Sequence, residues 1–175
     1  YYNILKGMAS VDRINSILDQ KFKIFEIADA LEINELKEKI EYKDVSFHYE
    51  TESRHVLKKI NLSIKRGETV ALVGQSGSGK STIVDLLPRF FDPIKGEVII
   101  DDINIKRYKI DSFRNLFGYV SQQPVLFNDS LYNNILFGKP DATSEQVENA
   151  ARLAFAHDFI MEKENAYQTN IGEGG

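Results

Sequence analysis

The sequence has no cysteine, no long apolar run and no excess of basic residues. Without cysteine there is neither a disulfide framework nor a thiolate metal site. No stretch of about 18 apolar residues occurs, so these residues hold no complete membrane-spanning helix. The net charge of −4 gives no general attraction to nucleic acid. What is present, 175 residues of which 42% are hydrophobic, suits one medium-sized domain with a single core.

The first 66 residues change from a helical to a strand pattern. Apolar residues recur at steps of three and four over residues 1–19, which predicts either a packing or coiled-coil helix or the end of a longer one. Residues 20–38 mix charges with short apolar runs and are interpreted as a linker. From Lys39 the apolar period is two, which predicts strands up to a turn at Arg66-Gly67. Val45, Phe47 and Tyr49 share one face of the first strand.

Beyond residue 66 the pattern alternates between strands and helices and ends in helices. The run TVALVG is short and wholly apolar, as in a strand buried within a sheet. A helix is expected from Lys80 to about Leu87, then a strand in GEVIIDD, a helix over residues 110–116 and a strand in FGYVSQ. After residue 124 the chain is expected to be helical, with a capping box at Thr143 and Gln146.

The strongest chemical signal is GQSGSGKST, which matches the phosphate-loop pattern G-x-x-x-x-G-K-[ST] between an apolar strand and a helix. Glycines let the backbone wrap closely around a phosphate, and successive N–H groups form an anion nest at the helix start. A lysine can reach phosphate oxygens as a point charge, and the next hydroxyl can ligate Mg²⁺. The predicted ATP-binding residues of this loop are Gly74, Gln75, Ser76, Gly77, Ser78, Gly79, Lys80, Ser81 and Thr82.

Two weaker signals narrow the class. Tyr49 lies on a strand before the loop, where its ring can stack on a base, although an aromatic residue on a strand more often belongs to the core. Gln122 ends the stretch YVSQ, and an amide there can ligate Mg²⁺ or orient a water; Gln123 is the adjacent alternative. Many nucleotide enzymes share a phosphate loop, so Tyr49 and Gln122 are the residues that indicate which class of nucleotide enzyme this is.

Taken together, these stretches resemble the nucleotide-binding domain of ATP-binding cassette (ABC) transporters, in the exporter branch that moves lipids, drugs or peptides. FHY resembles the adenine-stacking loop, VGQSGSGKST the Walker A motif, and YVSQQPVLFNDSLYNNI the Q-loop and the start of the helical subdomain. AHDFI and TNIGEGG resemble the segments that lead to the family's signature motif, and ASVDRINSILD the end of the last membrane helix. The likeness covers nearly the whole chain.

The resemblance implies a fold and a site. The fold is an α/β P-loop NTPase core with an antiparallel β subdomain and the beginning of an α-helical subdomain. ATP and Mg²⁺ are the implied ligands, with Tyr49 and Val56 at the adenine, and Ser81 and Gln122 at Mg²⁺. Gln122 is also the implied catalytic residue that orients the water. The implied divisions are residues 1–20 for the end of a membrane helix, 21–38 for the linker, 39–124 for the β subdomain and core, and 125–175 for the helical part.

The family's later motifs do not occur in these residues. We expect the chain to stop before the signature, so that the Walker B strand, its catalytic Glu and the switch His are absent and the isolated chain is inactive. IIDD at residues 99–102 is like Walker B in composition, but it precedes the Q-loop stretch, so Asp101 and Asp102 are interpreted as turn residues. ATP hydrolysis is expected of the parent protein.

The resemblance also implies partners and a location. A second nucleotide-binding domain would close the ATP site, and coupling helices of a transmembrane domain would contact the Q-loop region, at the cytoplasmic face of the plasma (inner) membrane. Val125, Leu126 and Phe127 lie beside that region, either in the core or at this contact. Two alternatives remain: a nucleotide-responsive module that binds without turnover, and an ABC ATPase acting on DNA or ribosomes. No basic stripe supports nucleic acid as a partner.

Overall fold

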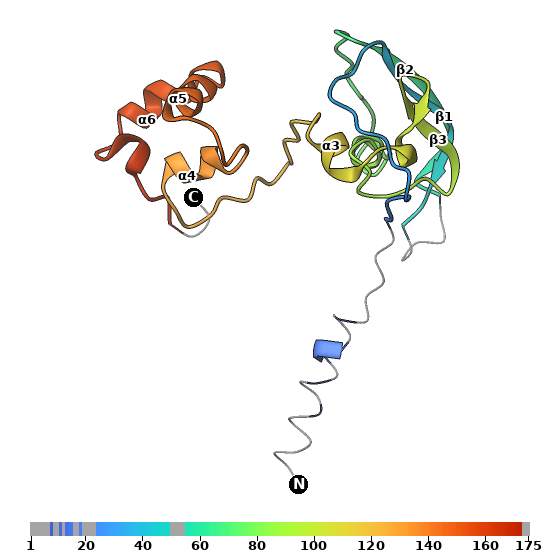
Figure 1. The fold of residues 1–175 in the computed structure, drawn as a ribbon, viewed down its shortest axis with the longest axis horizontal. Helices are drawn as coiled ribbons and strands as arrows, with labels where there is room; N and C mark the ends of the chain where they lie inside the picture. Colours follow the sequence, from blue (N-terminus) through green and yellow to red (C-terminus); the bar gives the residue numbers. More distant parts are fainter. Residues whose placement is uncertain are drawn as a thin grey trace. The chain divides into compact units, whose positions relative to one another are not determined.

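The computed structural model describes residues 24–49 and 55–172, together with six separate positions within the first 20 residues. The predicted helix over residues 1–19 therefore lies outside the described residues except at those six positions, which are helical. The chain divides into two compact units, residues 1–118 and residues 119–175 (Figure 1). The division expected between residues 124 and 125 stays a prediction.

The first unit is built on a four-stranded antiparallel sheet. Its strands are β1 (Lys39–Phe47), β2 (Leu57–Lys65), β3 (Lys95–Ile100) and β4 (Ile103–Asn104), in the order β2-β1-β3-β4. The expected antiparallel β portion is therefore confirmed, and β3 and β4 extend it. Alternate residues of β1 face the core, and Val45 and Phe47 are buried, as their period of two predicts.

A bulge explains an irregular step in the apolar pattern of β2. Leu57 is buried and Ile60 is half-buried, although a strict alternation would not place residues 57 and 60 on one face. Asp44 and Lys59 both have positive φ (49° and 47°), and the pairing of β1 with β2 shifts register between Tyr42 and Val45 and again between Val45 and Phe47. These irregularities re-aim the side chains, as β-bulges do.

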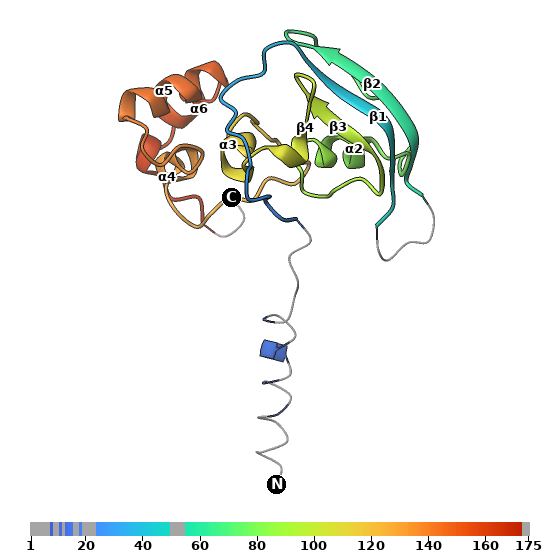
Figure 2. The ribbon, with the colours of Figure 1, turned by 45° about the vertical axis from the view of Figure 1, so that its right-hand side comes forward.

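Helix α2 (Lys80–Leu86) lies against one face of this sheet, as Figure 2 shows. The hydroxyl of Tyr42 in β1 donates to the carbonyl of Ile83 at 2.8 Å, and burial raises the pKa of Tyr42. Leu86, the last residue of this helix, is completely buried in the core. A 3₁₀ turn η1 (Ile105–Arg107) and helix α3 (Ile110–Arg114) complete the unit. The predicted helices after the phosphate loop and near residue 110 are confirmed.

Two predicted strands do not form. TVALVG and FGYVSQ belong to no strand, and Val73 and Val120 are 92% and 91% exposed. A wholly apolar strand is stable when neighbouring strands satisfy its backbone groups and cover both of its faces. Within residues 24–49 and 55–172 no strand pairs with either segment. The expectations of a buried strand at TVALVG and of a strand at FGYVSQ were therefore wrong.

The second unit is helical, as the pattern after residue 124 predicts. It holds α4 (Leu131–Leu136), α5 (Ser144–Leu153), α6 (His157–Met161) and a 3₁₀ turn η2 (Ala166–Gln168). The capping box of Thr143 and Gln146 is confirmed at the start of α5. Val147, Ala151 and Ile160 form its buried apolar centre. Among the described residues, no helix combines the length and apolarity that crossing a membrane requires.

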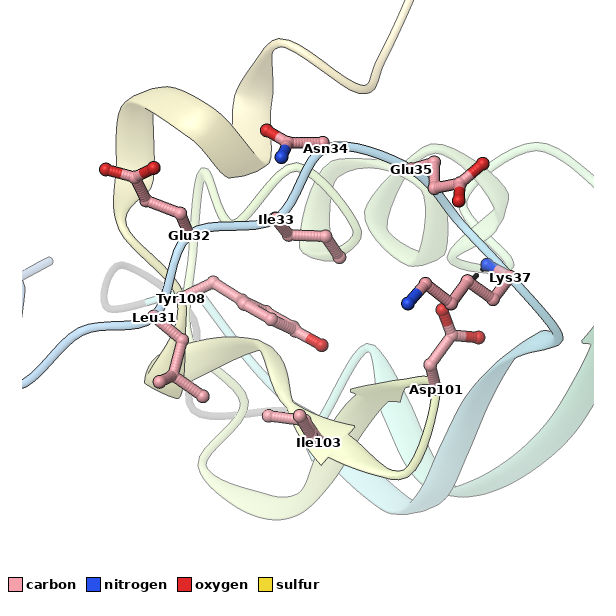
Figure 3. A pocket seen from close by; sticks show the side chains of 9 residues that line it. All are labelled: Leu31, Glu32, Ile33, Asn34, Glu35, Lys37, Asp101, Ile103 and Tyr108. Atoms are coloured by element: carbon pink, nitrogen blue, oxygen red, sulfur yellow. Dashed lines mark hydrogen bonds between the residues drawn. The ribbon is translucent and has the colours of Figure 1, made fainter.

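Residues 25–38 belong to the first unit and are here called the strap; they are hydrogen-bonded to segments farther along the chain. Leu31 donates to the carbonyl of Arg107 at 2.7 Å and accepts from the backbone of Lys109 at 2.8 Å. The strap's end reaches the β3–β4 turn, where Asp101 and Asp102 both have positive φ, so their interpretation as turn residues is confirmed. Together with Ile103 and Tyr108, the strap and this turn line a cavity of about 500 Å³ (Figure 3).

Asp101 anchors the end of the strap through its carboxylate. The carboxylate accepts backbone N–H groups from Lys37, Glu38 and Lys39 at 2.7, 2.8 and 3.0 Å. Burial opposes ionisation of this carboxyl, but the three donors outweigh burial and hold the pKa of Asp101 below its usual value. The acidic pair that is like Walker B in composition therefore has a structural role.

We expect Asp101→Asn to lower the free energy of unfolding by about 1–2 kcal/mol at pH 7, because a charge-assisted acceptor is lost. A lowered pKa stabilises the folded state above the unfolded value near about 4, and this stabilisation disappears as pH falls through the folded pKa. The difference between the two proteins should therefore shrink below about pH 4, as measured by urea denaturation at several pH values.

Asp102→Asn is the matched control. Its side chain is 72% exposed and pairs only at the surface, with Lys39 at 3.4 Å. An exposed ion pair contributes about 0–1 kcal/mol, so this variant should change little. Equal losses in the two variants would contradict the anchoring role of Asp101.

Candidate functional site

The predicted phosphate loop turns sharply at two glycines before α2 begins. Gly77 and Gly79 have φ values of 76° and 92°, which non-glycine residues rarely adopt. Gly79 is the N-cap of α2 in the left-handed conformation. A Cβ on Gly79 would lie 2.7 Å from Cδ2 of Leu57 and 3.2 Å from the carbonyl oxygen of Val56. The loop therefore sits directly on the first residues of β2, which only a glycine permits.

The loop presents a set of backbone donors. Ser78 donates to the carbonyl of Gln75, and the first helical bond of α2 runs from Ile83 to Gly79. Between Gln75 and Ile83, six N–H groups of the described chain donate to no acceptor, those of Ser76, Gly77, Gly79, Lys80, Ser81 and Thr82. Consecutive N–H groups at a helix start form a nest suited to anionic oxygens. The residues present therefore fit a phosphate group.

Lys80 reaches back over the loop. Its Nζ donates to the carbonyls of Gly74 and Gln75, each at 2.9 Å. An ammonium group has three donors, so one N–H remains for a phosphate oxygen while two hold the side chain across the loop. The positive charge is thus placed at the loop itself and not in bulk solvent.

The structure brings Tyr49, Val56 and Thr82 to the same loop. The hydroxyl groups of Tyr49 and Thr82 lie 3.1 Å apart, within hydrogen-bonding distance, and Thr82 is buried. Val56 contributes the carbonyl beneath Gly79, and its own N–H donates to the carbonyl of Phe47 at 2.8 Å. The two residues expected at the adenine therefore meet the phosphate loop from the end of β1 and the start of β2.

Phe91 is a neighbour of this site that the sequence did not reveal. Its ring lies 5.4 Å from that of Tyr49 and 5.6 Å from that of Phe47; Tyr49 meets both of these phenylalanine rings edge-on, and the two phenylalanine rings are tilted to each other. Such arrangements favour aromatic pairs and fix ring orientation. The motif PRFFDP gives a hint only in its adjacent aromatics, because its contact with residue 49 depends on the fold.

The other predicted residues are placed as follows. Ser81 is exposed at the start of α2, beside the buried Thr82. Gln122 and Gln123 are exposed and belong to the second unit. Val125 is 81% exposed, and Leu126 and Phe127 are also exposed, so the interpretation of these three as core was wrong.

The histidines show no sign of metal ligation. The rings of His48 and His55 pack edge-on at 5.4 Å, and His157 contacts the hydroxyl of Tyr167 at 2.8 Å. In the described ranges, no cluster of three or more His, Cys, Asp or Glu side chains is placed to hold a metal ion.

A phosphate loop of this geometry at the start of a helix packed on a sheet defines the class of P-loop nucleotide-binding proteins. Residues 57–173 match the family described as "ABC transporter", and the chain belongs to that family. The matched residues include the whole phosphate loop and the predicted Q-loop. The resemblance inferred from the motifs is therefore confirmed.

Relatives and a solved structure agree with this assignment. The chain is 41% identical over 172 residues to the "Putative multidrug export ATP-binding/permease protein YgaD" of Bacillus subtilis, covering 98% of the chain and 30% of that protein. It is 45% identical over 159 residues to a Staphylococcus aureus protein of the same description, covering 91% of the chain and 28% of the relative. A bacterial Atm1-family ABC exporter solved with ATP bound matches with a TM-score of 0.87 and 33% identity, covering 98% of the chain and 30% of the exporter chain. The chain thus spans under a third of the length of these proteins.

We expect Gly79→Ala to destabilise the protein through two effects. The left-handed φ costs about 1 kcal/mol for a residue with a Cβ, and overpacking against Leu57 adds about 1–3 kcal/mol. Gly67→Ala is the control, because Gly67 has a similar φ of 83° and nothing within 4 Å of an added Cβ. Urea denaturation should show the larger loss for residue 79, and equal losses would contradict the close approach at β2.

Proposed function

We propose that this chain is the ATP-binding part of an ABC exporter, in which ATP binding and hydrolysis drive export of a lipid, drug or peptide. The observation that carries the proposal is the phosphate loop, where six backbone N–H groups lack an acceptor and the Lys80 ammonium is held against the carbonyls of Gly74 and Gln75. The relatives support the exporter class, since two are described as multidrug export ATP-binding/permease proteins.

Each site residue then has a role in holding ATP. The loop N–H groups and Lys80 bind the β- and γ-phosphates. The ring of Tyr49, steadied by Phe91 and Phe47, stacks on the adenine, with Val56 beside it. The hydroxyl of Thr82 either leaves its hydrogen bond with Tyr49 to donate to a phosphate oxygen, or it keeps that bond while the Tyr49 ring stacks on the base.

Mg²⁺ is held by Ser81 and Gln122 in this proposal. Ser81 supports the assignment because its side chain is exposed at the helix start, while the neighbouring hydroxyl of Thr82 is already engaged with Tyr49. Mg²⁺ held there would supply positive charge to offset the negative charge that develops during phosphoryl transfer. Gln122 also orients the attacking water.

The partners follow from the same proposal. A second nucleotide-binding domain completes the ATP site, and coupling helices of a transmembrane domain contact the exposed apolar residues 125–127. The chain then works at the cytoplasmic face of the plasma membrane.

One observation favours nucleotide binding without turnover by these 175 residues alone. The carboxylate of Asp101, which resembles the end of a Walker B strand, is engaged by three strap N–H groups. A carboxylate committed in this way is unsuited to accept a proton from water. The chain alone is therefore proposed to bind Mg-ATP as a nucleotide-responsive module, with hydrolysis belonging to the longer protein.

A calorimetric titration of Mg-ATP into this chain, with phosphate release followed in the same sample, tests the proposal. We expect binding without sustained turnover. Lys80→Ala should weaken binding by about 10- to 100-fold, because a charge-assisted contact is worth about 1.5–3 kcal/mol. The matched control is Lys58→Ala, an exposed lysine of β2 outside the loop. Equal affinity for the wild type and Lys80→Ala would contradict the assigned phosphate site.

Two variants at residue 49 separate the ring from its hydroxyl. Base–aromatic stacking contributes about 1–3 kcal/mol, so Tyr49→Ala should weaken Mg-ATP binding by about 5- to 150-fold. Tyr49→Phe keeps the ring and loses only the bond to Thr82, so it should bind within about threefold of the wild type. The same titration measures both, and comparable losses in the two variants would rule out stacking as the role of this ring.

A further inference from the structure

Arg89 is a buried cation in the turn after α2, with a side chain only 4% exposed. Its Nε and Nη2 donate to the two carboxylate oxygens of Asp92 at 2.9 and 3.3 Å. Nη2 also donates to the backbone carbonyl of Phe25, 64 residues away, at 3.0 Å. One side chain therefore joins the segment that leaves α2 to the beginning of the strap.

The conformation of Arg89 shows that this position is held by its surroundings. Its φ is +56°, a left-handed value that favours glycine, and such outliers persist where neighbouring structure imposes them. Arg114 of α3 donates to the carbonyls of Pro88 and Arg89 at 3.1 and 2.9 Å. The Nη1 of Arg89 is buried and has no acceptor in the described part of the chain. Hydrogen bonding of the guanidinium is therefore incomplete in this position, and its own donors do not explain why the side chain lies there.

The same turn also contacts the nucleotide site. Phe91, two residues after Arg89, packs against the ring of Tyr49 at 5.4 Å. At its other end α2 begins at Lys80, directly after its N-cap Gly79, and a seven-residue helix is only about 10 Å long. The turn is thus linked to both halves of the proposed ATP site, to the base through Phe91 and to the phosphates through α2.

The strap is held elsewhere by parts of the fold farther along the chain. Ile110 donates to the carboxylate of Glu26 at 2.8 Å, Leu31 pairs beside η1, and Asp101 holds the strap's end. Glu35 forms an exposed ion pair with Arg66 at 3.8 Å. Arg89, by contrast, contacts the strap from the segment that directly follows α2.

We propose that Arg89 is a positioning residue that couples the nucleotide site to the strap, an inference that rests on the proposed binding of ATP. Nucleotide bound at the loop and at Tyr49 reduces the motion of α2 and of the turn after it. Because Arg89 of this turn donates to the Phe25 carbonyl, the start of the strap also becomes more ordered. Coupling between sites is reciprocal, so ordering of the strap raises nucleotide affinity by the same factor by which bound nucleotide favours the ordered strap.

Amide hydrogen exchange of the 175-residue chain, with and without saturating Mg-ATP, tests the coupling. In the wild type we expect slower exchange in the phosphate loop and about threefold slower exchange in residues 26–33. In Arg89→Gln, protection of the loop should remain while that of residues 26–33 falls below about 1.5-fold. Arg66→Gln is the matched control, because it removes an exposed arginine contact to the same strap and should behave as the wild type.

Arg89→Met combined with Asp92→Leu is the second variant, since replacing both partners of a buried pair by apolar residues preserves folding better than removing one. Two outcomes would overturn the coupling. In the first, Mg-ATP slows exchange in the wild-type loop but not in residues 26–33. In the second, Mg-ATP slows exchange in residues 26–33 of either folded variant as much as in the wild type. Unfolding of both variants, seen by circular dichroism, would make Arg89 purely structural and would also overturn it. A wild-type loop that does not respond to Mg-ATP would instead refute the proposed function.

Discussion

The close approach of Gly79 to the first residues of β2 determines where the phosphate loop lies. Leu57 is buried in the core, and the added Cβ of any other residue at 79 would overlap it. Because the left-handed N-cap is seated on Val56 and Leu57, the direction of α2 and of the N–H groups at its start is set by the sheet. The anion nest is thus a consequence of core packing, which gives it the rigidity that electrostatic preorganisation requires.

The same strand ends also bring the aromatic side of the site into place. Val56 pairs with Phe47 where β1 ends, so Tyr49 leaves the sheet beside the loop and its hydroxyl meets Thr82. Phe91 returns from beyond α2 to pack on this ring. The residues proposed to bind the base and those proposed to bind the phosphates therefore meet where β1 ends and β2 begins in the first unit.

The sequence predicted the elements whose stability is local and failed where stability depends on neighbours. The loop glycines, the helix after them and the capping box at Thr143 are specified within a few residues, and all of them form. TVALVG has the composition of a buried strand, and FGYVSQ was also expected to be a strand, but composition reports a preference and not the presence of partner strands. The contacts of Phe91 with Tyr49 and of Arg89 with Phe25 span 42 and 64 residues, and no local pattern encodes them.

Residues 25–38 show why composition is a poor guide to mechanical behaviour. Their mixture of charges and short apolar runs is typical of a loose linker, yet Ile33 is buried and Asp101 alone holds three successive backbone N–H groups. A flexible linker absorbs a displacement at one end by changing its own conformation. A segment whose backbone donors are committed to the fold must break those bonds before it can do so, and each costs about 1 kcal/mol or more. If the proposed coupling through Arg89 operates, a displacement at Phe25 would for this reason be transmitted along the strap and not absorbed within it.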